Sequence, residues 1–312
     1  MLRCVWKDIK GREIITPYPL TMSVSVDEKV PADSLNVEFP YVETDELCEI
    51  TVLNDDRTVF HGIVDEEEKV IYRDGEYLRI SARSLAALLL DNEAMPCVYD
   101  HPTAGFIYER YVAPFGIRCA DLDDAVSISE QTIAKGASCW SVLKNFCNAS
   151  YATPPRITSD GVLYMKGLQE RERIRFGKGG VSYLRISELN KRSAELSAVR
   201  VKTENPGNYN LCVSNKDAQK RGIKRERYLN ALLSDSPMRC ADMMLRNGAD
   251  KAYSLKLRCL GCLLGAEGSI AELDDPVLGE RTELYVSSLQ YRLTANGEYT
   301  DVRLKRRNSL CG

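Results

Sequence analysis

The side chains that most often perform acid–base catalysis are scarce in this sequence. The chain has two histidines, His61 and His101, and each stands apart from any recognisable nucleophile motif. A Ser-His-Asp triad needs a histidine base beside its nucleophile, and the zincin, phosphate-loop and nucleophile-elbow signatures are all absent from the sequence. The sequence therefore predicts no catalytic residue, and we expect a protein that is not an enzyme.

The cysteines indicate a reduced protein without a metal site. Eleven cysteines are scattered along 312 residues, and Cys259-Leu260-Gly261-Cys262 is the only pair with the spacing of a redox or zinc motif. A zinc site would need a second such pair or neighbouring histidines. We therefore interpret the pair as part of a strand. We expect no metal, no cofactor and free thiols, as is typical of a protein made in the cytoplasm.

Two further patterns have the composition of binding sites without their spacing. The segment Phe176-Gly177-Lys178-Gly179-Gly180 is rich in glycine, but it lacks the order of a phosphate-binding loop and is interpreted as a flexible turn. Neighbouring acids, Asp123-Asp124 and Asp274-Asp275, are expected by chance in a chain with 45 acidic residues. Carboxylates that are distant in sequence can still meet in the fold, so a metal or glycosidase site stays open as an alternative.

Composition and charge are those of a globular protein of two or three domains. Hydrophobic residues make up 44% of the chain and charged residues 28%. The longest apolar runs, such as Leu85–Leu90, are too short to cross a bilayer, and the first residues do not resemble a signal peptide. We therefore expect no membrane-spanning segment and no export by the usual route.

The net charge of −3 is unevenly distributed. Residues 1–100 are acidic, with a concentration at Asp65–Glu68, and residues 166–260 are basic, with the densest run at Lys220–Arg227. Such runs are typical of solvent-exposed faces. A more specific interpretation is that the acidic and basic regions of neighbouring copies attract one another in an assembly. The basic run has little aromatic interleaving beyond Tyr228, so no sequence-specific nucleic-acid binding is expected.

Apolar and polar residues alternate through the first ninety residues, and this pattern predicts β-structure. The turns Asn54-Asp55-Asp56 and Asp74-Gly75 are expected to close hairpins, and Ser84–Leu90 has a helical composition. Six or more short strands indicate a small barrel or sandwich. The predicted strands are Leu20–Val26, Leu35–Phe39, Leu47–Leu53, Thr58–Val64, Lys69–Tyr72 and Tyr77–Ala82.

Residues 103–170 predict a small α+β unit, and strand patterns resume after it. Helices are expected over Gly105–Ala113 and Ser138–Ser150, the second with Ser138 as its N-cap, and a hairpin is expected across Ser159-Asp160-Gly161. A later helix, Pro237–Arg246, is expected to stop at Asn247-Gly248. The predicted C-terminal strands are Glu195–Thr203 and Leu211–Val213, separated by a turn at 205–208, then Tyr253–Leu260, Glu283–Leu293 and Tyr299–Lys305, with a type I′ turn at Asn296-Gly297.

The series of elements resembles the baseplate hub proteins of contractile phage tails. These are the late control protein D and Mu-like tail hub family, which is also found in tail-derived bacteriocins and injection systems. Thr58–Asp65 and Leu78–Asp91 resemble the first barrel of that family, in which a G-x-V-D strand precedes a G-R-S-x-x-x-L-x-D segment. Ala82 stands where the family often has glycine. Ser138–Leu143 with Ser159–Leu163 is similar to the family's helix–hairpin unit, and Tyr285–Leu304 is similar to the closing hairpin of its second barrel.

The resemblance implies a mainly β fold with α+β inserts, formed by two tail-tube-like β-barrel domains and a small helix–hairpin insert domain. The implied domains are residues 1–92, 93–180 and 181–312, the last with a helical insertion around 215–250. Such a chain would be a structural hub subunit, whose homotrimer forms a pseudo-sixfold ring that connects the tail tube to the central spike.

The implied partners are the central spike protein, the tail tube protein, the tape-measure protein and other baseplate proteins. The implied location is the baseplate of a virion tail or tail-like particle, assembled in the bacterial host cytoplasm. Two alternatives stay open, a tail-associated cell-wall hydrolase and a carbohydrate-binding module at the tail tip. Exposed aromatic side chains on a concave face would favour the carbohydrate-binding module, and the chain has sixteen tyrosines that could supply them.

Overall fold

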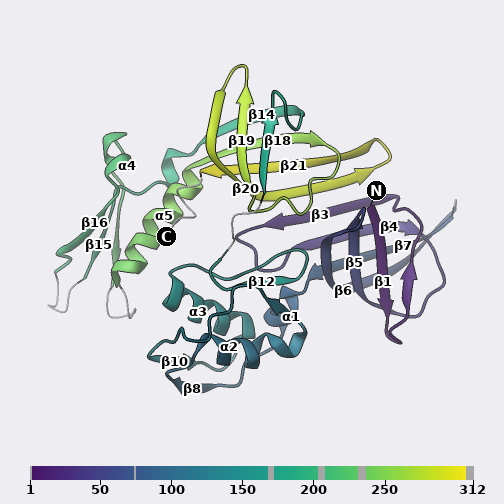
Figure 1. The fold of residues 1–312 in the computed structure, drawn as a ribbon, viewed down its shortest axis with the longest axis horizontal. Helices are drawn as coiled ribbons and strands as arrows, with labels where there is room; N and C mark the ends of the chain where they lie inside the picture. The colour runs from purple at the N-terminus through teal and green to yellow at the C-terminus, as the bar shows by residue number, and fades with distance from the viewer. Residues whose placement is uncertain (1, 74, 168–171, 203–207, 231–236, 307–312) are drawn as a thin grey trace.

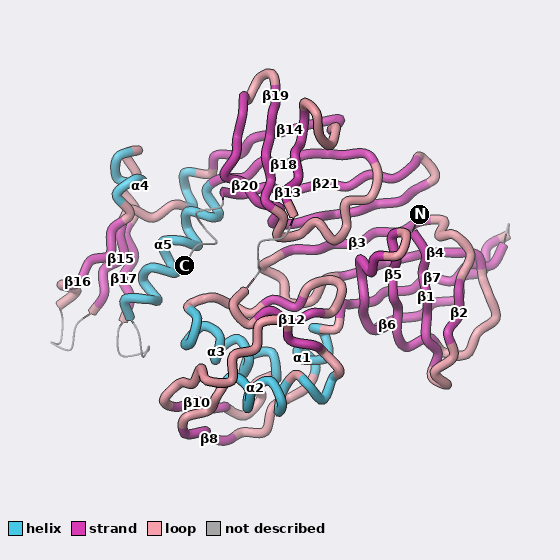
Figure 2. The backbone as a smooth tube through the Cα atoms, viewed as in Figure 1, coloured by secondary structure: helices cyan, strands magenta, loops and turns pink. Residues whose placement is uncertain are grey.

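The computed structural model describes residues 2–73, 75–167, 172–202, 208–230 and 237–306 (Figure 1). The fold is mainly β, as expected, and strands dominate two of its four regions (Figure 2). In the view of Figure 1 the first β region lies at the right, a helix-bearing region below, the second β region above and a small α/β unit at the left. None of the described helices is long and apolar enough to cross a membrane.

The first β region is an antiparallel sheet in the order β3-β4-β7-β6-β5-β1-β2. Its apolar residues alternate as predicted, so that Met22, Val24 and Val26 of β3 are buried while the residues between them are partly exposed. Its strands are β1 (Leu2–Asp8), β2 (Glu13–Ile15), β3 (Thr21–Asp27), β4 (Ser34–Pro40), β5 (Leu47–Asn54), β6 (Arg57–Tyr72) and β7 (Gly75–Ser84).

Strand β6 differs from the prediction. The sequence predicts two strands separated by the acidic run Asp65–Glu68, whereas β6 is one strand of 16 residues that continues through this run. The run pairs with β7, and its side chains are exposed on both faces, so the apolar alternation disappears while the strand goes on. Asp74 of the predicted Asp74-Gly75 turn lies outside the described residues.

The helix-bearing region has its own core, in which Trp140 and Phe146 are buried. Ser138 caps helix α3 as predicted, because its hydroxyl accepts a hydrogen bond from the backbone N–H of Ser141 at 3.2 Å. The region consists of α1 (Ala86–Asp91), β8 (Cys97–Asp100), α2 (Ala104–Tyr111), a 3₁₀ turn (Ala113–Phe115), β9 (Arg118–Cys119), β10 (Glu130–Ile133), α3 (Cys139–Tyr151), β11 (Arg156–Ile157) and β12 (Val162–Tyr164).

The second β region has the order β14-β18-β21-β20-β19-β13, and all its pairings are antiparallel except that of β13 with β19. The predicted strands over Tyr253–Leu260, Glu283–Leu293 and Tyr299–Lys305 are confirmed. The strands are β13 (Arg173–Gly177), β14 (Tyr183–Asn190), β18 (Tyr253–Leu260), β19 (Ile270–Asp275), β20 (Gly279–Thr294) and β21 (Gly297–Arg306).

A small α/β unit is inserted between β14 and β18. Helix α5 continues through the predicted stop at Asn247-Gly248. The glycine has a packing role instead, because Gly248 lies against the carbonyl oxygen of Ala194, where a built Cβ would come within 3.0 Å. The predicted turn at 205–207 and Thr203 lie outside the described residues. The unit consists of a 3₁₀ turn (Arg192–Ala194), β15 (Ala198–Val201), β16 (Leu211–Ser214), α4 (Lys216–Lys220), β17 (Glu226–Leu229) and α5 (Pro237–Ala252).

The two β regions form one sheet instead of two closed barrels. Strand β20 pairs antiparallel with β3, from Ser288 opposite Asp27 to Leu293 opposite Met22, and so joins the regions into a 13-stranded sheet. One apolar cluster extends across both regions. Among the described strands neither region closes on itself, because β14 and the second half of β6 each leave one edge without a partner strand.

The two regions are repeats of one another. The order β3-β4-β7-β6-β5 in the first corresponds to β14-β18-β21-β20-β19 in the second. The next strand differs in direction, because β1 pairs antiparallel with β5 whereas β13 pairs parallel with β19. The registers agree as well. Val64 pairs with Ala82 and Glu66 with Ser81 in the first hairpin, as Val286 pairs with Leu304 and Ser288 with Arg303 in the second.

The same register continues outward through the neighbouring strands. Asn36 lies opposite Ser81 and Ser23 opposite Asn36, as Lys256 lies opposite Arg303 and Ser187 opposite Lys256. A matching strand order alone could arise twice independently. A matching order, register and bulge together indicate a duplicated unit.

Candidate functional site

Neither histidine is placed for catalysis. The Nε2 atom of His61 lies 2.6 Å from Glu49 Oε1, and its backbone N–H donates to the carbonyl oxygen of Ser159. His101 is exposed in the loop after β8. Among the described residues no hydroxyl or thiol forms a hydrogen bond with either ring.

Cys259 is buried and Cys262 is partly buried, both against the apolar cluster. Cys259 lies in β18 and Cys262 in the loop that follows, and burial raises the pKa of both thiols to about 11. Such thiols are poor nucleophiles and poor metal ligands at neutral pH. Within the described part of the chain, no three His, Cys, Asp or Glu side chains are grouped so that they could hold a metal ion.

The glycine-rich segment and the acidic pairs have structural roles. Gly177 lies so close to Asp274 that a built Cβ would come within 2.0 Å of its carbonyl oxygen, and the backbone N–H of Lys178 donates to the same oxygen. Asp275 accepts hydrogen bonds from the backbone N–H groups of Val277 and Leu278 and from the Tyr183 hydroxyl. Asp123 and Asp124 are exposed in a loop.

A continuous polar face extends over an eight-stranded part of the sheet, β14-β18-β21-β20-β3-β4-β7-β6. The opposite face of these strands carries the apolar cluster, so the two faces differ as the alternation requires. The polar face consists of Thr21, Ser23, Ser25, Asp27, Asn36, Glu38, Glu66, Glu68, Arg79, Ser81, Arg185, Ser187, Lys256, Arg258, Ser288, Gln290, Arg292, Asp301 and Arg303.

Ion pairs between neighbouring strands organise this polar face. Arg79 donates to Glu38 Oε2 at 2.7 Å, and Arg258 forms a two-point contact with Asp301 at 2.7 and 2.8 Å. Because these groups are partly exposed, each pair adds little to stability, and its main effect is to fix side-chain positions.

The two repeats contribute different charges to the polar face. The part over the first repeat contains a hollow of about 330 Å³ lined in part by Glu38, Glu66 and Glu68. The corresponding part over the second repeat has a hollow of about 380 Å³ lined by Arg185, Lys256, Arg258 and Arg303 among others. Arg79 and Arg292 also line the first hollow and Asp301 the second, so this face is mixed in charge over the first repeat and basic over the second. The densest basic run of the sequence, Lys220–Arg227, lies elsewhere, in the α/β unit.

A buried ion pair attaches the helix-bearing region to the β sheet. Arg156 in β11 donates to both carboxylate oxygens of Asp33, at 2.7 and 2.6 Å, and to the carbonyl oxygens of Asp27 and Val30. Burial raises the pKa of Asp33 to about 6, although the charge of Arg156 acts in the opposite direction. The β11–β12 loop also reaches the second repeat, where Ser159 Oγ donates to Glu267 Oε1 at 3.0 Å.

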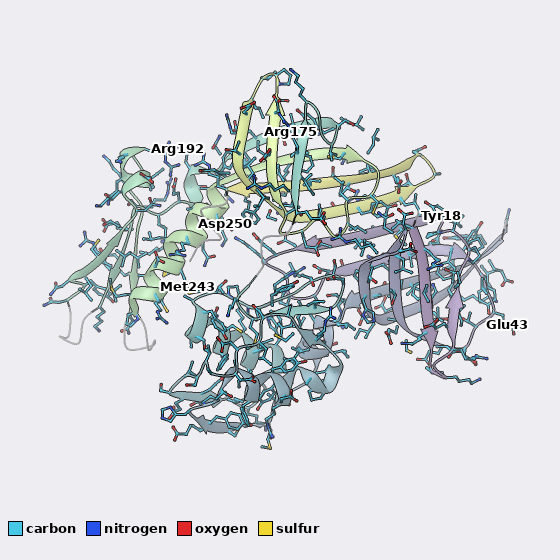
Figure 3. The ribbon with its side chains drawn as sticks, in the orientation of Figure 1. Tyr18, Glu43, Arg175, Arg192, Met243 and Asp250 are labelled. Carbon is cyan, nitrogen blue, oxygen red and sulfur yellow. The ribbon has the colours of Figure 1, made fainter. Side chains whose placement is uncertain are left out.

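A second ionic cluster ties α5 to the junction between β3 and β20. Lys305 in β21 lies 2.6 Å from Glu28 Oε1 and 3.1 Å from Asp250 Oδ2, and Lys29 also contacts Asp250. Figure 3 labels Asp250 on the face of α5 that is turned toward the second β region. Burial raises the pKa of Asp250, but the lysines outweigh it and leave the pKa below its ordinary value.

The family resemblance implied two similar β domains, but the residues themselves predicted neither the repeat nor these buried ion pairs. One local signal of the duplication exists, because Gly75-Glu76-Tyr77 and Gly297-Glu298-Tyr299 begin the second strands of the two matching hairpins. Three residues are too few to identify a repeat without the strand register. The partners of Arg156 and Lys305 lie more than a hundred residues away in sequence or on another element, so no spacing pattern identifies them.

No protein-family model matches the chain, and no curated protein sequence matches it. Several solved structures are similar to the chain. A 43 kDa tail protein of prophage MuSo2 from Shewanella oneidensis has a TM-score of 0.80 at 13% identity, covering 99% of both chains. A tail protein from Neisseria meningitidis has a TM-score of 0.75 at 16% identity, covering 98% of this chain and 96% of that one.

A third solved structure comes from a secretion system. It is an Escherichia coli component of the type VI secretion system, described as similar to the T4 phage tail proteins gp27 and gp5, with a TM-score of 0.57 at 8% identity over 92% of this chain and 73% of that one. The polar face and the duplicated sheet thus occur in a chain that has the fold of phage tail proteins.

Proposed function

We propose that this chain is a structural hub subunit in the baseplate of a contractile phage tail or a tail-derived particle. It acts by assembly and carries no catalytic site. Three copies form a ring with six nearly equivalent positions, which connects the tail tube to the central spike. The duplication is the observation that carries this proposal, because two matching repeats per chain turn a threefold ring into a pseudo-sixfold one.

The polar face is the wall of the axial channel in this proposal. A ring built from the continuous sheet has one apolar and one polar surface, and the apolar one is already covered within the chain. Serine, threonine, asparagine and ion-paired side chains hold water, so a channel lined by them lets polar cargo pass without tight binding. The tape-measure protein is the candidate for such transient contacts.

The remaining regions make the outer contacts in this proposal. The helix-bearing region, within residues 93–180, and the α/β unit around 215–250 extend from the ring, whose body consists of the barrel-like domains 1–92 and 181–312. They are available to the spike and to other baseplate proteins. The fold shared with a type VI secretion component that is similar to two T4 tail proteins, gp27 and gp5, supports a place among the tail proteins for this chain.

Mass measurement of the intact protein tests the function. The purified chain of 35.0 kDa, alone and mixed with the candidate spike protein, is measured by native mass spectrometry and imaged by electron microscopy. We expect a trimer with an axial channel and a complex of three chains with the spike. A monomer that binds no spike, together with clearing of purified cell walls, would replace the hub by a hydrolase. Retention on purified glycans would favour the carbohydrate-binding module.

A further inference from the structure

The open half of β6 and the open edge of β14 correspond to two strands that are paired inside the chain. In the hairpin register Glu66 of β6 corresponds to Ser288 of β20, and in the sheet register Ile186 of β14 corresponds to Met22 of β3. Strand β20 pairs with β3 over these residues, whereas among the described strands the same half of β6 and the outer edge of β14 have no partner.

We propose that β6 of one copy pairs with β14 of a second copy, antiparallel and in the register that β20 and β3 show within the chain. The proposal rests on the hub function and names the contact that closes its ring. Transfer of the internal register gives these residues opposite one another: Glu66 and Lys191, Glu67 and Asn190, Glu68 and Leu189, Lys69 and Glu188, Val70 and Ser187, and Ile71 and Ile186.

The charges agree with this register. Glu66 meets Lys191 and Lys69 meets Glu188, so two of the six positions bring opposite charges directly together. A slip by two residues in one direction keeps the same faces but places Glu66 opposite Leu189 and Lys69 opposite Ile186, which loses both pairs. A slip by two in the other direction places Glu68 opposite Lys191 but leaves Lys69 opposite Asn190. Lys69 therefore meets Glu188 only in the proposed register, and this pair is the contact that distinguishes it.

The internal junction is more apolar than the two open edges, because the internal junction forms as the chain folds whereas the open edges face water until assembly. The internal junction is apolar, with Leu289, Tyr291 and Leu293 of β20 buried against β3, because this contact is never exposed once the chain has folded. The open edges must stay soluble before assembly. Glu67 and Lys69 stand where Leu289 and Tyr291 stand in the second repeat, and charges on an open edge oppose unspecific pairing.

Exposed apolar side chains lie at the end of the proposed β6–β14 pairing. Ile71 is 69% exposed and Tyr72 50% exposed on β6, and Leu184 is 66% exposed on β14. Pairing would place Ile71 against Ile186 and bring the ends of both strands together, so it would remove part of this apolar surface from water. The contact is head-to-tail, because β6 and β14 lie on opposite edges of the eight-stranded part, and such contacts close into a ring or extend as a filament.

Cross-linking between full-length variants tests the register. Ile71→Cys protein is mixed with Ile186→Cys protein under mild oxidation, and the linked peptides are identified by mass spectrometry. The control is Ile71→Cys mixed with Ser187→Cys, in which the neighbouring residue of β14 points to the other face. We expect the disulfide in the first mixture and at least tenfold less in the second. Equal yields, or no link in either, would overturn the pairing.

Charge exchange provides an independent measurement. Lys69→Glu should weaken self-association at least tenfold in sedimentation experiments, and combining it with Glu188→Lys should restore it. Lys10→Glu, a change of the same kind on an exposed lysine outside both edges, should leave association unchanged. Failure of the double variant to recover would contradict the proposed contact.

The two proposals can fail separately. A protein with both Ile71→Cys and Ile186→Cys should give closed, covalent trimers. A ladder of linear chains would keep the strand pairing and reject the trimeric hub. Trimers in native mass spectra without any link would keep the hub and reject this pairing.

Discussion

Asp65 in β6 and Ser287 in β20 are the extra residues of two β-bulges at the same step of two matching hairpins. A bulge bends a strand and increases its twist, so both long strands change direction at the same point. The first half of β6 pairs with β5 and the first half of β20 with β19, and the second half of β20 pairs with β3 of the other repeat. Among the described strands, the second half of β6 pairs with β7 alone. The bend thus lets β20 complete its own sheet and still join β3.

Removal of the guanidinium from the buried Arg156–Asp33 pair should destabilise the fold strongly. Arg156→Ala leaves Asp33 buried without its partner, and we expect the free energy of unfolding to fall by about 3–5 kcal/mol. Urea titration followed by tryptophan fluorescence measures it. Arg200→Ala, which breaks the exposed pair with Glu226, is the matched control and should leave the midpoint in place. Equal effects in the two variants would contradict the assigned role of burial.

Stability should depend on pH through Asp33. Its pKa of about 6 lies above the ordinary value of 3.8, so between about pH 4 and 6 the folded state keeps a proton that the unfolded chain has released. The contribution of this group therefore falls as pH rises through that window, by at most about 1.4 kcal/mol per pH unit. The difference in unfolding free energy between the natural chain and Asp33→Asn should change from pH 4 to pH 6. A constant difference would refute the raised pKa.

Gly62 should tolerate no side chain. A built Cβ would lie 2.2 Å from the carbonyl oxygen of Arg83 on β7, which is backbone and cannot turn away. Gly62→Ala should therefore cost about 1–3 kcal/mol or more, measured by thermal unfolding. Gly75→Ala, in the same hairpin, meets only the hydroxyl of Tyr77 at 3.4 Å and should cost much less. A reversed order of the two variants would contradict the close approach of the strands.

Thiol labelling should separate the cysteines by burial. At pH 8 a thiol with a pKa of about 11, such as Cys259 or Cys262, is ionised to only about one part in a thousand, and only the thiolate reacts with iodoacetamide. Cys48 and Cys212 are exposed and should be modified first, as measured by peptide mass spectrometry of the native protein. Rapid modification of the Cys259–Cys262 pair, or its release of a bound metal, would reject the purely structural interpretation.

The sequence allowed many of the strands with one buried face to be predicted, although β1 and β19 were missed. Met22, Val24 and Val26 alternate because the two faces of β3 meet different surroundings. The same reasoning failed at Glu66–Glu68, where both faces of β6 meet solvent and alternation has no cause within one chain. It failed again at Gly248, because the contact that keeps glycine inside α5 comes from Ala194, far away in sequence.

The candidate site was harder to predict from the sequence than the fold was. The polar face is built from single residues on eight strands, and only the pairing registers bring Ser23, Lys256 and Arg303 to one surface. The expected absence of catalytic, cofactor and metal residues remains a prediction. The domain limits at residues 92 and 180 also remain predictions, because strands of both β regions share one apolar cluster.

The position of β3 beside β20 has a consequence for synthesis. The partner of β3, residues 288–293, is synthesised about 260 residues after it. During that part of translation the nascent chain carries an uncovered hydrogen-bonding edge flanked by Met22, Val24 and Val26, which are the residues that the finished molecule hides. A growing polypeptide of this kind is exposed to mispairing with its neighbours on the same message, and its dependence on chaperones should end only when the β20–β21 hairpin is complete.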